Sequence, residues 1–224
     1  LAGGSPAELD EPLRRIQEDV LKGDNVAVKE HIRSALELNY SPRDILELGM
    51  LSAMEVIGGR FKDGTVFIPE VLLSARVLNE ALPLLEPLLS DGESLHMGKI
   101  LIGTVHGDLH DIGKNLVSTM LKGVGYEVVD LGINVAVEEF VNRVARHRPD
   151  ILAVSALLTT TMPQMEKVID GLQSAGLRSN TLVIVGGAPV NDKFARDIGA
   201  DGYARDAGEA VELARNLLAP HSDS

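Results

Sequence analysis

The chain has 224 residues, 45% of them hydrophobic and 24% charged, which is typical of a globular protein and unlike a disordered or fibrous one. Acidic residues (33) outnumber Lys and Arg (21), and the formal charge of −12 argues against direct binding to nucleic acid or to an anionic membrane. Cysteine is absent, which excludes disulfides, thiolate zinc sites, iron–sulfur clusters and cysteine nucleophiles. No apolar run is long enough for a membrane span and residues 1–6 do not resemble a signal peptide, so we expect a cytoplasmic protein.

The first ninety or so residues predict helices, because apolar residues recur there every three or four positions. The expected helices cover residues 9–22, 24–38, 41–59 and 69–85. Ser41 offers a capping hydroxyl to the third helix, which has Pro42 at its first position and is expected to end near Gly58 and Gly59. Four helices with short connections indicate a small bundle.

The polar run Ser90–Ser94 interrupts this pattern, and we place a domain boundary between residues 92 and 93. Beyond it, short β-branched runs alternate with helical stretches. The expected strands are 99–105, 126–131, 150–155, 181–185 and a short one near 202–203. The expected helices are 112–123, 137–147, 162–175, 190–198 and 207–218. This order predicts an α/β chain: a helical domain (1–92), then a five-stranded, doubly wound parallel sheet of Rossmann-like type (93–224).

Ligands bind open parallel sheets at the carboxyl ends of the strands, and the loop after the first strand is rich in candidate groups. A Walker A motif has four residues between its first glycine and the Gly-Lys pair, and a Ser or Thr after the lysine. This loop does not form one, since five residues separate Gly107 from Gly113 and Asn115 follows the lysine. In Asp108-x-His110-x-x-Gly113, the histidine can bind a metal through one ring nitrogen while the carboxylate fixes the other. Two other interpretations are not yet excluded at this point: a solvated polar loop without a ligand, and a metal site that also uses His106.

Two further loops follow the third and fourth strands. The first carries hydroxyls at Ser155 and at residues 159–161, more than a helix cap requires, and so offers donors to a polar ligand. The second carries Gly186 and Gly187, which permit close approach of a bulky ligand or form an ordinary turn.

Together these three loops resemble the cobalamin-binding domain of methionine synthase and of corrinoid methyltransferase proteins. The matching stretches are Asp108–Gly113, the Ser155-x-Leu157 run with Thr159 and Thr161, and Gly186-Gly187. Upstream, residues 58–71 are similar to the helical cap of the same family. The resemblance covers residues 8–218 and includes three motifs in order.

The resemblance implies a role for each matching residue. His110 would be the lower axial ligand of cobalt and displace the cofactor's dimethylbenzimidazole, Asp108 would hold the other imidazole nitrogen, and Thr161 would extend the relay where the family often has serine. Ser155 and Thr159 would flank the displaced nucleotide tail, with room made by Gly186 and Gly187. The remaining expected cofactor contacts are Gly107, Leu109, Asp111, Ile112, Gly113 and Leu157 in the loops, and Phe61, Ile68 and Val71 in the cap over the methyl-bearing face.

The function implied is that of a methyl carrier, with cobalamin cycling between its methylcobalamin and cob(I)alamin forms. One methyltransferase would deliver a methyl group from a methylated substrate, a second would pass it to a folate or thiol acceptor, and a reductive activator would restore cobalt(I). The chain alone would not be catalytic. The alternatives are the small subunit of a cobalamin-dependent mutase, which lacks a four-helix cap, and a cobalamin-binding regulator, which needs a DNA-binding segment.

Overall fold

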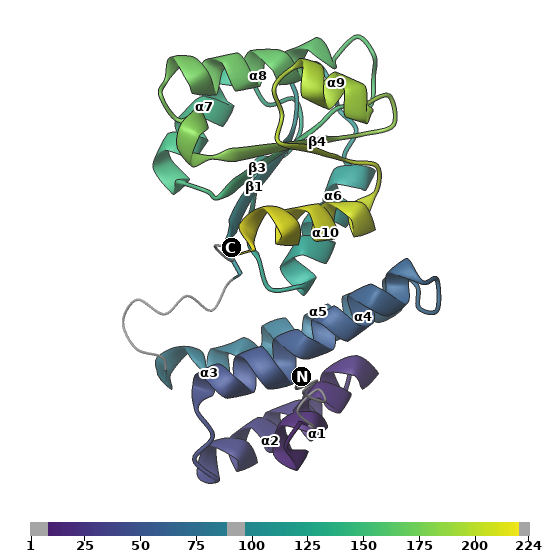
Figure 1. Ribbon diagram of the computed structural model, residues 1–224, viewed down its shortest axis with the longest axis vertical. Coiled ribbons are helices and arrows are strands. Elements are labelled where there is room, and N and C mark those ends of the chain that lie inside the picture. Colours follow the sequence, from purple (N-terminus) through teal and green to yellow (C-terminus); the bar gives the residue numbers. More distant parts are fainter. Residues whose placement is uncertain (1–8, 89–96, 220–224) are drawn as a thin grey trace, which may run out of the picture. The chain divides into compact units, whose positions relative to one another are not determined.

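The computed structural model describes residues 9–88 and 97–219, which form a helical unit and an α/β unit (Figure 1). The boundary expected between residues 92 and 93 lies outside the described residues. Within the two described ranges, no helix is both long enough and apolar enough to cross a membrane.

The helical unit contains the expected helices, with one irregular stretch. Its elements are α1 (Glu11–Lys22), α2 (Asn25–Glu37), α3 (Pro42–Asp44), the π-helical η1 (Ile45–Leu51), α4 (Ser52–Lys62), α5 (Ile68–Ala81), and the 3-10 turns η2 (Leu82–Leu84) and η3 (Glu86–Leu88). Asp24 caps α2 by accepting the N–H groups of Val26 and Ala27, and Ser41 caps α3 by accepting that of Asp44. Since α3, η1 and α4 are continuous, they form the single third helix that the sequence predicts.

Two expected helix ends were wrong. The third helix continues past Gly58 and Gly59 to Lys62, because both glycines stay helical and the chain turns instead at Gly64, with φ +71°. The fourth helix ends at Ala81, since Pro83 has no N–H to continue the α-helical pattern.

The α/β unit is a five-stranded parallel sheet in the order β2-β1-β3-β4-β5. Its strands are β1 (Lys99–Thr104), β2 (Glu127–Asp130), β3 (Ile151–Ser155), β4 (Leu182–Gly186) and β5 (Gly202–Ala204). Its helices are α6 (Ile112–Gly123), α7 (Val137–His147), α8 (Pro163–Ser174), α9 (Asp192–Asp197) and α10 (Ala207–Leu218), with the 3-10 turn η4 (Arg178–Asn180) before β4. Helices α7, α8 and α9 cover one face and α6 and α10 the other (Figure 1), so the predicted doubly wound fold is confirmed.

The register of the sheet brings the three candidate loops together. Thr104 pairs with Ser155, and Ser155 with Gly186, so β1, β3 and β4 end in line. The strand order reverses between β1 and β3, which is where doubly wound sheets open a crevice for ligands. Apolar residues of the strands pack against α7 and α8 behind this edge, with Phe140 fully buried.

Candidate functional site

His110 lies in the loop between β1 and α6, with its ring held by a neighbouring carboxylate. Its Nδ1 is 2.7 Å from Oδ1 of Asp108, whose side chain is fully buried, whereas the His110 side chain is 50% exposed. Because a carboxylate accepts, Nδ1 carries the proton and Nε2 keeps its lone pair. The half-exposed ring therefore presents a nitrogen suited to a metal, with a carboxylate behind it.

Asp108 accepts hydrogen bonds from two loops. Besides the ring of His110, Oδ1 receives the backbone N–H of His110 at 3.1 Å. Its Oδ2 receives the N–H groups of Leu157 at 2.7 Å and Leu158 at 3.3 Å, together with the hydroxyl of Thr161 at 2.8 Å. Burial raises the pKa of Asp108, but the donors from Leu157, His110 and Thr161 outweigh it, and the pKa lies well below its usual value. Asp108 is therefore an anion that joins the His110 loop to the loop after β3.

Thr161 is buried, and its hydroxyl has two acceptors within reach. Its Oγ1 lies 2.8 Å from Asp108 Oδ2 and 2.9 Å from the carbonyl oxygen of Leu158. One O–H can serve only one of them at a time, so the hydroxyl contributes a single donor to the carboxylate. The structure thus brings together His110, Asp108 and Thr161 in the order that the resemblance implies.

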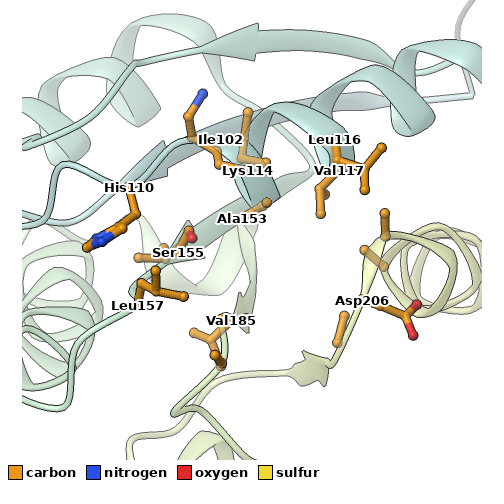
Figure 2. Close-up of a pocket in the computed structure, with 18 of the residues that line it drawn as sticks. Ile102, His110, Lys114, Leu116, Val117, Ala153, Ser155, Leu157, Val185 and Asp206 are labelled. Carbon is orange, nitrogen blue, oxygen red and sulfur yellow. The ribbon is translucent and has the colours of Figure 1, made fainter.

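A pocket of about 510 Å³ opens beside His110, between the sheet and helices α6 and α10 (Figure 2). His110, Ser155 and Leu157 lie at one end of it, and Leu116 and Val117 of α6 lie across from the start of α10. Small and aliphatic side chains form much of the wall: Ile102, Ala153, Ile184, Ala204, Ala207 and Ala210. The pocket suits a flat, mostly apolar group that enters between the strand ends.

Most of the loop residues expected to contact a cofactor line this pocket. They are Leu109, His110, Asp111, Ile112, Gly113, Ser155, Leu157, Gly186 and Gly187. Gly107 and Thr159 do not line it. A Cβ on Gly187 would lie 1.9 Å from the carbonyl oxygen of Ala156, so the backbone already requires glycine there.

The three residues expected over the upper face of the cofactor belong to the helical unit. Phe61 and Ile68 are half-buried, and Val71 is 1% exposed. Their role over the methyl-bearing face stays a prediction.

Several residues around the site have no place in the predicted motifs. Thr104 and Asn134 hydrogen-bond to the His110 loop, and Ala207 and Ala210 reach the pocket from α10. Lys114 is buried and ion-paired with Asp130 at the end of β2. Lys114 directly follows the Asp-x-His-x-x-Gly motif, so its place in the sequence could have marked it. The contacts of the other four residues depend on how the strands pair.

The donor set fits cobalt held in a corrin. Within residues 9–88 and 97–219, no group of three or more His, Cys, Asp or Glu side chains is placed to hold a metal ion by itself. A corrin supplies four nitrogens of its own and needs only one axial ligand from the protein. His110 offers that ligand, and the neighbouring pocket can receive an apolar base.

Known proteins share both units. A B12-binding domain family matches residues 98–212, and a second B12-binding domain family matches residues 12–86. A corrinoid protein of Desulfitobacterium hafniense is 39% identical over 92% of this chain and 97% of its own length. Dimethylamine corrinoid protein 1 of Methanosarcina acetivorans is 43% identical over 80% of this chain and 84% of its own.

Solved structures agree with these matches. The crystal structure of a methanol:cobalamin methyltransferase complex from Methanosarcina barkeri matches with 30% identity and a TM-score of 0.82, covering 96% of this chain and 83% of that one. A cobalamin-binding protein from Desulfitobacterium hafniense matches with 31% identity and a TM-score of 0.74, over 94% and 99% of the two chains. The chain belongs to the cobalamin-binding corrinoid proteins of methyltransferase systems, and cobalamin is its cofactor.

Proposed function

We propose that this chain carries a methyl group on cobalamin between two methyltransferases, one specific for the methylated substrate and one for the acceptor. The observation that carries the proposal is the imidazole of His110, fixed by buried Asp108 at the mouth of an apolar pocket. The bound cobalamin supplies a cobalt atom that accepts and releases the methyl group. Neither a mutase subunit nor a gene regulator is favoured by the relatives, which are corrinoid proteins matched over 97% and 84% of their own length.

Each part of the site has a task in this function. His110 would hold the cobalt of bound cobalamin through Nε2, and Asp108 keeps the ring in one orientation and one tautomer. Thr161 and the N–H of Leu157 hold Asp108 as an anion, which makes the imidazole a stronger donor. The pocket between the sheet and α10 would hold the nucleotide tail of the cofactor.

The partners belong to the same proposal. The names of the relatives refer to dimethylamine and to a methanol:cobalamin methyltransferase complex, so small methylated amines and methanol are the donors to test first. A folate or a thiol is the expected acceptor, and a reductive activator is the expected third partner. The acidic surface gives nucleic acid and anionic membranes no electrostatic attraction, and we place the protein in the cytoplasm with its partners.

The test replaces the proposed axial ligand. His110→Ala should retain cobalamin through the pocket but lose the absorption spectrum of histidine-ligated cobalt(III), because the proposed imidazole ligand is removed. His106→Ala, which removes the other imidazole of the same loop at an exposed position outside the pocket lining, serves as control and should keep the spectrum. An unchanged spectrum in His110→Ala would overturn the assignment of His110.

A further inference from the structure

The turn that carries His110 is held by two residues outside it. Thr104, the last residue of β1, donates its hydroxyl to the carbonyl oxygen of His110 at 3.0 Å. Asn134, in the loop after β2, accepts the N–H of Gly107 through Oδ1 at 2.7 Å and donates its own N–H to the carbonyl oxygen of Asp108 at 3.0 Å. Each of these bonds fixes backbone rather than a side chain of the turn.

Thr104 is well placed to hold the carbonyl of His110 because its own backbone is fixed by hydrogen bonds at the end of β1. The residue is fully buried, its N–H donates to the carbonyl of Gly132 and its carbonyl accepts the N–H of Val135, both at 3.0 Å. A buried hydroxyl with a fixed backbone has little freedom to leave its acceptor, and water does not compete for it.

Asn134 holds the start of the turn from the opposite side. Its φ of +54° lies in the left-handed region, which asparagine, aspartate and glycine tolerate better than other residues. In that conformation its side chain accepts a hydrogen bond from Gly107, and its backbone N–H donates one to the next residue, Asp108. The residue is exposed, so its side chain can be changed without opening the core.

We propose that Thr104 and Asn134 are positioning residues that fix the backbone of His110 and thereby set the strength of its bond to cobalt. Neither residue lines the pocket, so both act through the turn and not by touching the cofactor. The inference rests on the proposed function, in which His110 is the axial ligand.

The test uses two variants that each remove one hydrogen bond with little other change. Thr104→Val replaces the hydroxyl by a methyl group of similar size, and Asn134→Gly keeps the left-handed backbone but loses Oδ1. As the proposed ligand, His110 would hold cobalt(II) and be released from cobalt(I), so a weaker His110 bond would raise the midpoint potential of that couple in the cobalamin-loaded protein. Losing one such hydrogen bond should weaken the bond roughly 2- to 10-fold. At 59 mV per tenfold this is an upward shift of about 18 to 59 mV.

Three control variants separate positioning from general stability. Thr104→Ser keeps the hydroxyl and Asn134→Asp keeps an acceptor, so both should restore a potential close to that of the wild type. Asn191→Gly removes a similar bond from Oδ1 to the N–H of Phe194, 3.0 Å long, at the start of α9. It should lower the stability of the fold and leave the potential unchanged.

The possible results distinguish the two proposals. Wild-type potentials in Thr104→Val and Asn134→Gly, alongside a shifted potential in His110→Ala, would overturn the positioning role and leave the proposed function intact. An equal shift in Asn191→Gly would also overturn it, because the effect would then follow stability. If His110→Ala itself changed neither potential nor spectrum, the assignment of His110 as ligand would fail. Should Thr104→Val destabilise the core, the exposed Asn134→Gly still decides the question.

Discussion

Asp108 joins two loops through a single buried side chain. Its two oxygens together accept five hydrogen bonds, two from His110 and one each from Leu157, Leu158 and Thr161. Such a group is stable only as an anion with all its donors in place, because an unpaired buried charge is costly. Asp108 therefore stabilises the folded loops as well as orienting the ring of His110.

Asp108→Asn should destabilise the cobalamin-free protein by about 1–3 kcal/mol at pH 7, since an amide NH₂ would face a backbone N–H or the imidazole N–H. The folded-state pKa of Asp108 is depressed, so its contribution is complete above the unfolded pKa and is lost as the pH falls below roughly 4. Urea unfolding of both proteins between about pH 7 and about pH 2 measures the difference, which should stay constant down to roughly pH 4 and shrink below it. The exposed Asp111→Asn is the control. A difference independent of pH would contradict this account.

At the scale of the elements, α10 and the sheet form the deep part of the pocket with small side chains. Ala204 ends β5, and Ala207 and Ala210 follow on α10, all three of them lining the cavity. Larger residues at these positions would fill the space in which the nucleotide tail is proposed to lie.

Ala210→Phe should therefore weaken cobalamin binding by roughly ten- to hundredfold, since overfilling a site typically costs about 1–3 kcal/mol. Cobinamide, a corrinoid without the nucleotide tail, should bind the variant as well as it binds the wild type. Asn216→Phe, at an exposed position of the same helix, is the matched control. Titrations followed by absorbance measure the six affinities, those of the two corrinoids for the wild type, the variant and the control. Equal losses for cobalamin and cobinamide would place the tail elsewhere.

At the scale of the whole molecule, the chain combines a cobalamin-binding α/β unit with a helical unit, and both match B12-binding families. The resemblance implies that the helical unit protects the upper, methyl-bearing face of the cobalamin, through Phe61 and Ile68. If the helical unit has this role, it would have to open for a methyltransferase, as lids do in enzymes.

Replacing both Phe61 and Ile68 by alanine should expose reduced cobalamin to oxygen. We expect cobalt(I) to re-oxidise in air several-fold faster than in the wild type, as followed by stopped-flow absorbance, with cobalamin still bound. Leu38→Ala removes an apolar side chain that is 62% exposed on the same unit and should not alter the rate. Unchanged re-oxidation in the double variant would mean that these residues do not shield cobalt.

The sequence alone determined the two kinds of unit, the strand and helix order and the Asp108–His110 motif. These features are local: apolar periodicity, caps such as Asp24 and Ser41, and a carboxylate two positions from a histidine act within a turn or two of chain. The resemblance to corrinoid proteins rested on the same short motifs and is confirmed by the relatives.

Only the tertiary structure decided which residues hold the motif in place. Asn134 contacts Gly107 across 27 positions, and the N–H of Leu157 contacts Asp108 across 49. These contacts depend on the order in which the strands pair and on a register that ends β1, β3 and β4 in line. No local pattern marks a threonine as the donor to His110 or an alanine as the wall of a pocket, because those roles arise only when the sheet brings distant loops to one edge.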